Sequence, residues 1–475
     1  MPKRLRPLSG LDAGFLYLEA AGTPMHVGSV MRIEPRRARG YDFHRDLLRH
    51  LAERLPRAPV LRRVLQPAPL ELGHPMWREV AEIDLESHVL KRRLPKPGSD
   101  KQLAALVAKL HATLLDRDRP LWQFAVIEGL ASGEIALYSK IHHAVLDGQG
   151  GVALAQALLD LEPRLPARTR AKKPAADEGA APRQRDVART ALRANVQQLV
   201  KLFRAVPPVL KLANEARGDS TLDALREGIG RLRDSVLIAP RTRFNRQVSD
   251  ERSFAGLSLP LDAIKRVAKG FEVSLNDVVM SLCAGALRSF LASSDELPGK
   301  PLVAAMPVSL RSAGDAEVNN QVSMVQCPLP TDLADPLERL QAVAVATRGI
   351  KQRVNAVRGL IPTDFPGLAA PIWASGLSRL WARGRVAERL PALANLAISN
   401  VPGPPVPLFL AGARINQYFP VSIVTHGLGL NITVQSYAGM LEFGITACRD
   451  ALPKPELLTR HLQRELDLLL EQLPA

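Results

Sequence analysis

The sequence predicts an α/β protein of two large domains joined by a basic linker. Strand-like and helix-like runs alternate over about the first 160 residues, and the alternation resumes near residue 249. The segment between them is rich in Pro, Ala, Arg and Lys and begins without apolar periodicity. The 475 residues suffice for two or three domains. We therefore place the boundaries at 1–163, 164–246 and 247–475.

Apolar and β-branched runs predict the strands of the first part, and helical spacing of apolar residues predicts its helices. A turn that contains Gly129 and Gly133 joins the last two strands, and Pro163 ends the last helix. The expected strands are His26–Ile33, Leu121–Glu128 and Glu134–His142, and the expected helices are Lys101–Leu115 and Gly150–Leu161.

The linker carries most of the excess positive charge. The chain has 63 basic and 47 acidic residues, a net charge of +16, and residues 163–246 alone hold 19 basic and 8 acidic residues, a net charge of +11. We expect 164–185 to be flexible. Residues 187–203 then have the pattern of a basic amphipathic helix, which Pro207 and Pro208 end. Such a helix either lies on a membrane surface or packs on its own protein, and the sequence leaves both open.

The same patterns predict the elements of the last part. The helix that begins near Asn276 is long and apolar, with Asn276 or its neighbour near its N-cap, and a tight turn at residues 437–439 joins the last two strands. The expected strands are Phe254–Leu259, Pro301–Val308, Leu396–Val401, Gly412–Val421, Gly429–Tyr437 and Met440–Ala447. The expected helices are Leu261–Val267, Asn276–Leu291, Asp335–Gln352 and Pro455–Gln472.

Composition excludes several classes of protein. Hydrophobic residues make up 46% and charged residues 23%, which is typical of a globular protein. The three cysteines are far apart and form no CxxC pair, which argues against a disulfide framework or a cysteine zinc site. No apolar run reaches the ~18 residues of a spanning helix, and Asp12 and Glu19 interrupt any signal peptide. We expect a cytoplasmic protein. Because the charge is concentrated in one segment and aromatic residues make up only 4%, we expect no nucleic-acid partner.

The sharpest motif is His142-His143-Ala144-Val145-Leu146-Asp147-Gly148, at the end of a predicted strand. Successive strand side chains point to opposite faces, so only one of the two histidines can face a given cleft, and the other must pack or form a hydrogen bond behind it. A neutral histidine is well matched to proton abstraction near pH 7. No nucleophilic Ser or Cys sits beside it in a GxSxG setting, which argues against an acyl-enzyme hydrolase. Adjacent strand histidines diverge, which argues against a metal site.

The motif resembles the HHxxxDG motif of CoA-dependent acyltransferases of the chloramphenicol acetyltransferase-like superfamily. The chain is more specifically similar to the bacterial wax ester synthase/acyl-CoA:diacylglycerol acyltransferase family along almost its whole length. The supporting segments, in order, are Leu8–Ala13 with Thr23–Gly28, Pro120-Leu121-Trp122, Asn276-Asp277, Pro307–Arg311 and Ser399–Pro404. The resemblance implies two domains of mixed sheet and helices with an active-site tunnel at their interface.

The resemblance also implies roles for the residues. His143 would be the general base, with His142 and Asp147 in support, and Gly148 would permit the turn. Asp147 would pair with an arginine, for which Arg119 and Arg311 are both candidates. Asn276 is either an oxyanion donor or a plain N-cap.

Three further residues are candidates for substrate binding. Trp122 contacts substrate or only shapes the fold, and Ser399 and Asn400 line the tunnel or end a strand.

The implied reaction moves a long-chain acyl group from acyl-CoA to diacylglycerol or a long-chain alcohol, with acyl-CoA as substrate and no bound cofactor or metal. The basic linker suggests peripheral attachment to the inner membrane face or to lipid droplets. Two alternatives stay open: another HHxxxDG acyltransferase with a different hydroxyl or amine acceptor, and a non-catalytic binding protein that uses the basic linker.

Overall fold

The computed structural model describes residues 5–69, 74–146, 148–165, 187, 189–190, 237–309, 322–357 and 386–474. Asp147, Arg311 and nearly all of the linker and its predicted helix lie outside these ranges. Of that helix, Val187 is buried in a small apolar cluster with Ala68 and Met76.

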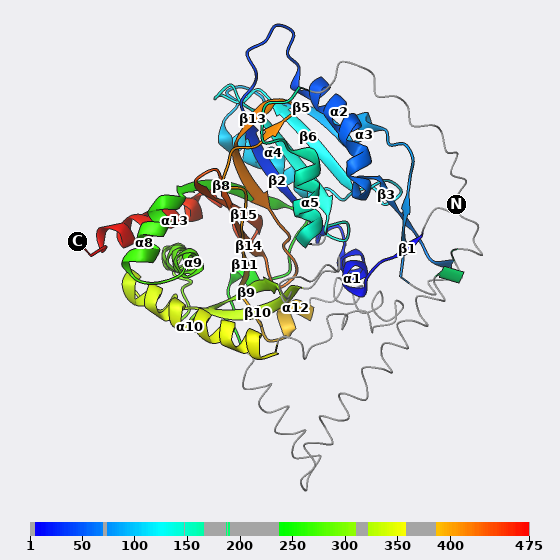
Figure 1. Cartoon of the computed structure of the whole chain (residues 1–475). Helices are drawn as coiled ribbons and strands as arrows, with labels where there is room; N and C mark the ends of the chain where they lie inside the picture. Colours follow the sequence, from blue (N-terminus) through cyan, green and yellow to red (C-terminus); the bar gives the residue numbers. More distant parts are fainter. Residues whose placement is uncertain are drawn as a thin grey trace.

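Two six-stranded mixed sheets form the frame of the protein (Figure 1). The first contains the double histidine at the end of one of its central strands, and all its neighbouring strands run antiparallel except the pair β5–β6. In spatial order its strands are β12 (Phe409–Leu410), β13 (Ala413–Val421), β2 (His26–Ile33), β7 (Ile135–His142), β6 (Trp122–Glu128) and β5 (Val89–Arg93).

Helices cover both faces of the first sheet because its strands alternate apolar side chains between them. On β6, Trp122 and Phe124 belong to one apolar cluster, whereas Ala125 and Ile127 belong to another. The helices α1 (Gly10–Leu18), α2 (Phe43–Arg54) and α5 (Gly148–Leu158) supply the first cluster, and α4 (Asp100–Ala112) supplies the second. A short helix α3 (Leu85–His88) precedes β5, and a small three-stranded sheet contains β1 (Arg6–Pro7), β4 (Met76–Glu79) and β3 (Arg63–Gln66).

The second sheet is built from the C-terminal part of the chain. In spatial order its strands are β10 (Val322–Leu329), β9 (Leu302–Ser309), β11 (Leu396–Val401), β14 (Leu430–Tyr437), β15 (Met440–Cys448) and β8 (Arg252–Pro260). Its helices lie together on one side of the sheet, as Figure 1 shows. They are α8 (Leu261–Gly270), α9 (Leu275–Ala292), α10 (Pro336–Val357) and α13 (Glu456–Glu471), with a short helix α12 (Val386–Arg389) elsewhere.

The helix α9 forms the centre of the second core. Residues along most of its length are buried between the sheet and its neighbouring helices, α10 and α13. By length and composition alone α9 could span a membrane, but 72% of its apolar window is buried inside the protein. Asp277 and Arg288 interrupt its apolar sequence, and the burial identifies α9 as a core helix.

The domain boundaries drawn from the sequence need one correction. Residues 409–421 belong to the C-terminal part of the chain, yet they form β12 and β13 in the first sheet, where β13 pairs with β2. Close approach of the two sheets explains why glycines face this strand. A Cβ on Gly444 would lie 1.7 Å from the carbonyl oxygen of Pro420, and one on Gly256 would lie 2.9 Å from the ring of Phe419. The strand β13 therefore joins the two halves.

A buried acid lies at the same junction. Glu442 of β15 has no exposed surface, accepts a hydrogen bond from Ser258 Oγ, and leaves its Oε1 without a partner. Gln417 of β13 donates to Ser258 Oγ at 2.9 Å, so the contact runs from one sheet to the other. Burial raises the pKa of Glu442 to about 7.

Candidate active site

The double histidine lies where β7 ends and the chain turns. His142 is the last residue of the strand and lies opposite His26 of β2 in the antiparallel register. The amide N–H of His143 donates to the carbonyl oxygen of Met25 at 2.8 Å, and that of Val145 donates to the carbonyl oxygen of His142 at 2.9 Å. Main-chain hydrogen bonds from the residue before β2 and within the turn therefore fix both histidines.

His143 is partly buried against α1. Its ring stacks on that of Phe15, with centroids 4.0 Å apart and 18° between the planes. Burial lowers the pKa of His143 to about 4, although a contact with its own main chain opposes this shift. Its Nδ1 is buried without a well-aligned hydrogen-bond partner. His143 is thus neutral at pH 7.

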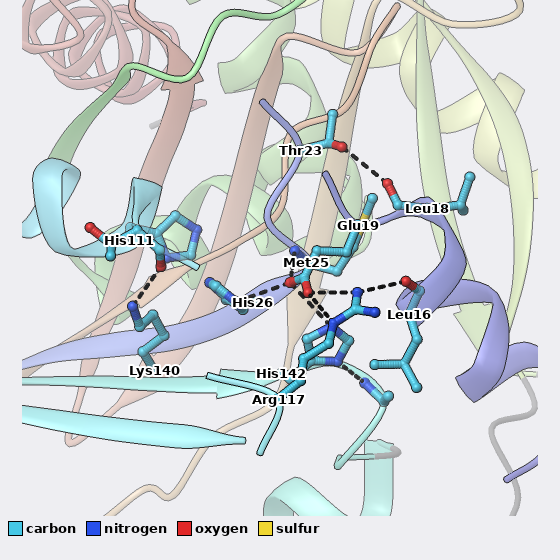
Figure 2. Close-up of polar contacts among 12 residues, drawn as sticks. Leu16, Leu18, Glu19, Thr23, Met25, His26, His111, Arg117, Lys140 and His142 are labelled. Carbon is cyan, nitrogen blue, oxygen red and sulfur yellow. Dashed lines mark hydrogen bonds and ion pairs between the residues drawn. The ribbon is translucent and has the colours of Figure 1, made fainter. Parts of the chain in front are cut away.

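His142 faces the interior, as the alternation of strand side chains predicts. It is fully buried, and its Nδ1 accepts a hydrogen bond of 3.0 Å from the amide N–H of Ala144. Its Nε2 lies 3.3 Å from Oε1 of Glu19, the residue that follows α1 (Figure 2). His142 therefore connects the turn to a buried carboxylate.

Glu19 is the centre of the polar contacts in Figure 2. Its Oε1 lies 3.2 Å from Nε2 of His26 as well as close to His142, and it accepts from the amide N–H of Met25 at 3.3 Å. Its Oε2 accepts from Arg117, at 3.2 Å from Nε and 2.9 Å from Nη2. Burial opposes the charge, but the contacts with His142 and His26 outweigh it and hold the pKa of Glu19 well below its ordinary value.

A second layer of buried polar groups surrounds His26. Burial lowers the pKa of His26 to about 4 and that of Lys140 to about 8. Lys140 donates to the carbonyl oxygens of Leu110 and Thr113, where α4 ends. The ring of His111 lies edge-on to that of His26. These contacts tie the end of α4 to the strands that carry the histidines.

The structure brings two of the predicted site residues together. Asn400, exposed on β11, donates from Nδ2 to Oδ1 of Asn276 at 3.4 Å. Within the described ranges, no hydrogen bond or ring contact joins this pair to His143. Ser399 is partly buried on the same strand, next to Asn400. Whether Ser399 and Asn400 line a tunnel stays a prediction.

The N-cap of α9 is Ser274, so Asn276 lies near the N-cap, as expected, but is not the capping residue itself. Ser274 and Asp277 form a capping box, because Ser274 Oγ accepts from the amide of Asp277 and Asp277 Oδ2 accepts from the amide of Ser274. Asp277 also accepts from Thr347 Oγ1 at 2.6 Å. Asp277 is therefore structural, and the Asn276 amide is not used as a cap.

Trp122 is a core residue of the first sheet. It is 1% exposed, stacks on His88, and donates from Nε1 to the carbonyl oxygen of Leu61 at 2.8 Å. This packing accounts for the residue without a substrate. Direct contact of Trp122 with a substrate stays a prediction.

The predicted partner of Asp147 stays open, because Asp147 and Arg311 lie outside the described residues. Arg119, the other candidate, pairs with Asp116 at 3.4 Å. Gly148, which we expected in the turn, is the first residue of α5.

Sequence reasoning missed Phe15, Glu19, His26 and Arg117. The signal that could have identified Phe15 and Glu19 is their i, i+4 spacing at the end of an N-terminal helix, which places them on one side. His26 begins a strand and lies within Thr23–Gly28, a segment singled out only for the family resemblance. Arg117 has no local signal, since its role depends on the tertiary contact with Glu19.

A surface cavity of about 490 Å³ lies elsewhere, where the chain enters β8. It is lined by Arg243, Phe244, Arg246, Gln247, Val248, Ser249, Glu388, Gly429, Cys448, Asp450 and Ala451. None of the residues predicted for the site lines this cavity.

Comparison with known proteins identifies relatives along almost the whole length of the chain. A family model described as the wax ester synthase/diacylglycerol acyltransferase catalytic domain matches residues 8–279, and the model of the C-terminal domain of the same family matches residues 318–470. A Mycobacterium tuberculosis protein named for diacylglycerol O-acyltransferase activity is 37% identical over 97% of this chain and 98% of its own. A second such protein from that organism is 34% identical, over 96% of each chain.

Solved structures agree with this placement. The wax ester synthase/diacylglycerol acyltransferase from Marinobacter aquaeolei VT8 has 30% identity and a TM-score of 0.68, with 98% of each chain covered. The first condensation domain of the calcium-dependent antibiotic synthetase has 16% identity and a TM-score of 0.54 over 100% of this chain and 98% of its own, which is a likeness of fold alone. Both the predicted fold class and the resemblance are confirmed. The chain belongs to the wax ester synthase/diacylglycerol acyltransferase family.

Proposed function

We propose that this protein is an acyl-CoA-dependent O-acyltransferase that forms triacylglycerol, wax ester or both, with His143 as its general base. The observation that carries the base assignment is the neutral ring of His143, held at the end of β7 with Nδ1 buried. Family membership supports the reaction. The names of the relatives support diacylglycerol or a long-chain alcohol as the acceptor, and the choice between the two is for experiment.

In the reaction, Nε2 of His143 takes the proton of the acceptor hydroxyl. The acceptor oxygen forms a bond to the thioester carbonyl carbon, the carbon–sulfur bond breaks, and the proton passes to the CoA sulfur. Positioned proton transfer of this kind contributes ~10²–10⁴-fold to the rate. The side-chain amide of Asn276 is the candidate donor to the oxyanion, and a helix N-terminus adds a favourable dipole. Acyl-CoA acts as the substrate, and no bound cofactor or metal takes part.

The deciding experiment measures thiol release from palmitoyl-CoA by the purified protein, with hexadecanol, with dipalmitoylglycerol and with neither. We expect release that requires an acceptor and that falls at least 100-fold in His143→Ala. The two acceptors are then ranked by kcat/KM. Absence of acceptor-dependent release, or an unimpaired variant, would overturn the proposal and favour an acceptor of another class or a binding protein.

Peripheral attachment to the inner membrane face or to lipid droplets is part of the proposal. The net charge of +11 in residues 163–246 supports it, because basic segments bind anionic headgroups. Deletion of residues 168–185 should weaken binding to vesicles that contain anionic lipid. Unchanged binding would rule out this stretch as the anchor.

A further inference from the structure

The buried contacts of Glu19 indicate a role for a residue other than the general base. We propose that Glu19 is a positioning residue for His143: its carboxylate holds His142 in the tautomer that fixes the turn on which His143 stands. The inference rests on the proposed function, in which His143 is the base. It assigns a role to a buried acid that the reaction itself does not use.

Two independent contacts specify the same tautomer of His142. An ionised carboxylate only accepts hydrogen bonds, so Nε2 of His142, 3.3 Å from Glu19 Oε1, is stabilised there when it carries a proton. At the other side of the ring, Nδ1 accepts the amide N–H of Ala144 and so carries none. The contact between His142 Nε2 and Glu19 Oε1 is not ideally aligned for a hydrogen bond. An unprotonated Nε2 would nevertheless turn its lone pair toward the carboxylate at this distance, and the two would repel each other.

The tautomer matters because Ala144 is the next residue after His143. The hydrogen bond from its amide to His142 Nδ1, together with that from Val145 to the carbonyl of His142, closes the turn around His143. If His142 carried its proton on Nδ1, two N–H groups would face each other and the turn would lose this support. The direction of the His143 ring would then be less well fixed.

Main-chain atoms provide a second path from Glu19 to His143. The amide of Met25 donates to Glu19 Oε1, and the carbonyl of the same residue accepts from the amide of His143 at 2.8 Å. Phe15 provides a third contact, because it lies one helical turn before Glu19 and stacks on the His143 ring. The segment of α1 and its C-cap thus contacts both histidines of the motif.

Arg117 contacts the carboxylate of Glu19 from the solvent side. Its guanidinium donates to Glu19 Oε2 through Nε and Nη2, and also to the carbonyl oxygen of Leu16 near the end of α1. The side chain of Glu19 is 3% exposed and that of Arg117 is 47% exposed. A substitution at Arg117 therefore disturbs the carboxylate without opening a cavity in the core, which provides a second test when a buried substitution is poorly tolerated.

The test uses the full chain and two measurements. In Glu19→Gln we expect kcat with hexadecanol to fall about 10- to 100-fold, the cost that loss of an orienting partner has for metal-bound histidines, while KM for palmitoyl-CoA stays within threefold. Arg117→Gln should show a smaller loss, and Arg117→Lys should recover part of it. Glu442→Gln, the same change at a buried acid between the sheets, is the matched control and should keep wild-type kcat.

The second measurement is the ¹⁵N spectrum of protein labelled at its ten histidines, with His142 assigned from its loss in His142→Asn. We expect His142 to carry its proton on Nε2 in the wild type and to show a weaker preference for Nε2 in Glu19→Gln, in which only the amide of Ala144 still specifies that tautomer. This readout does not depend on turnover, and a purely structural role would not move it.

The outcomes separate the two proposals. If the wild type releases no CoA with any acceptor, or His143→Ala is unimpaired, the proposed function fails. If the wild type releases CoA with an acceptor and His143→Ala is impaired, the proposed function stands. The positioning role alone then fails if Glu19→Gln keeps kcat within threefold of wild type, or if wild-type His142 carries its proton on Nδ1. If Glu19→Gln does not fold, a wild-type kcat in Arg117→Gln overturns the positioning role.

Discussion

The ring of Phe15 lies almost parallel to that of His143, with centroids 4.0 Å apart. An apolar ring on one face removes water from the imidazole, which disfavours its charged form. The stack therefore acts in the same direction as burial, which lowers the pKa of His143 and keeps the base unprotonated well below pH 7.

This neutral base predicts an unusual pH profile. Because the pKa of His143 is lowered from 6.5 to about 4, the base loses function only as pH falls toward 4. We expect kcat/KM for the acceptor to stay flat from pH 8 to pH 6. Initial rates across this range provide the measurement, and enzyme returned from low pH to pH 7.5 provides the control for unfolding. A half-maximal rate near pH 6.5 would contradict the prediction.

The two residues of the Asn276-Asp277 pair should separate catalysis from stability. Asp277 is buried, closes the capping box of α9 and accepts from Thr347, so Asp277→Ala should lower the free energy of unfolding by about 1–3 kcal/mol. Asn276→Ala should change it by less than about 0.5 kcal/mol but lower kcat by ~10²–10³-fold if its amide meets the oxyanion. Urea unfolding and turnover with palmitoyl-CoA measure the two effects. Full activity of Asn276→Ala would remove the oxyanion role.

Trp122 should matter for stability rather than for turnover. Trp122→Phe removes the hydrogen bond to the carbonyl of Leu61 and leaves that oxygen unpaired in the core, which should lower the free energy of unfolding by about 1–3 kcal/mol. Trp77→Phe is a useful comparison, since Trp77 lies in the same cluster and no described residue accepts a hydrogen bond from its indole. A kcat that falls more than tenfold in folded Trp122→Phe would favour direct substrate contact instead.

Glu442 should make the stability of the protein fall as pH rises. Its pKa is raised from 4.5 to about 7 in the folded state, so the unfolded chain releases this proton first. Between pH 4.5 and about pH 7 the free energy of unfolding therefore falls by up to about 3 kcal/mol. Glu442→Gln removes this titration. The free energy of unfolding of the variant, relative to that of the wild type, should therefore be higher at pH 8 than at pH 5. Equal pH dependence in the two proteins, measured by urea unfolding, would contradict the assignment.

Sequence alone was sufficient where the determinants are local. The bounds of β2 and β11 match those expected from their apolar patterns, and the histidine pair could be identified because its strand and turn lie within one stretch. The helix α2 was missed although it has a clear signal, an N-capping Asp42 followed by apolar residues at helical spacing. That omission reflects an overlooked pattern and not a lack of one.

Other features depend on contacts between distant segments. Glu19 acquires its role only because β2 and β7 pair in a register that places His26 opposite His142, and Arg117 then reaches the same carboxylate. The crossing of β13 into the first sheet is equally non-local, since it pairs residues nearly 400 positions apart. Periodicity identifies such a strand but does not identify its neighbour.

The crossing of β13 also constrains how the protein can be made. Until residue 421 has emerged from the ribosome, β2 remains an edge strand, with the hydrogen-bonding groups of one side unsatisfied. The site is encoded mainly in the first third of the gene, yet its sheet is completed only when synthesis is nearly finished. A nascent chain therefore depends on protection of that edge for most of its synthesis, and a fragment that stops before β13 should expose it permanently.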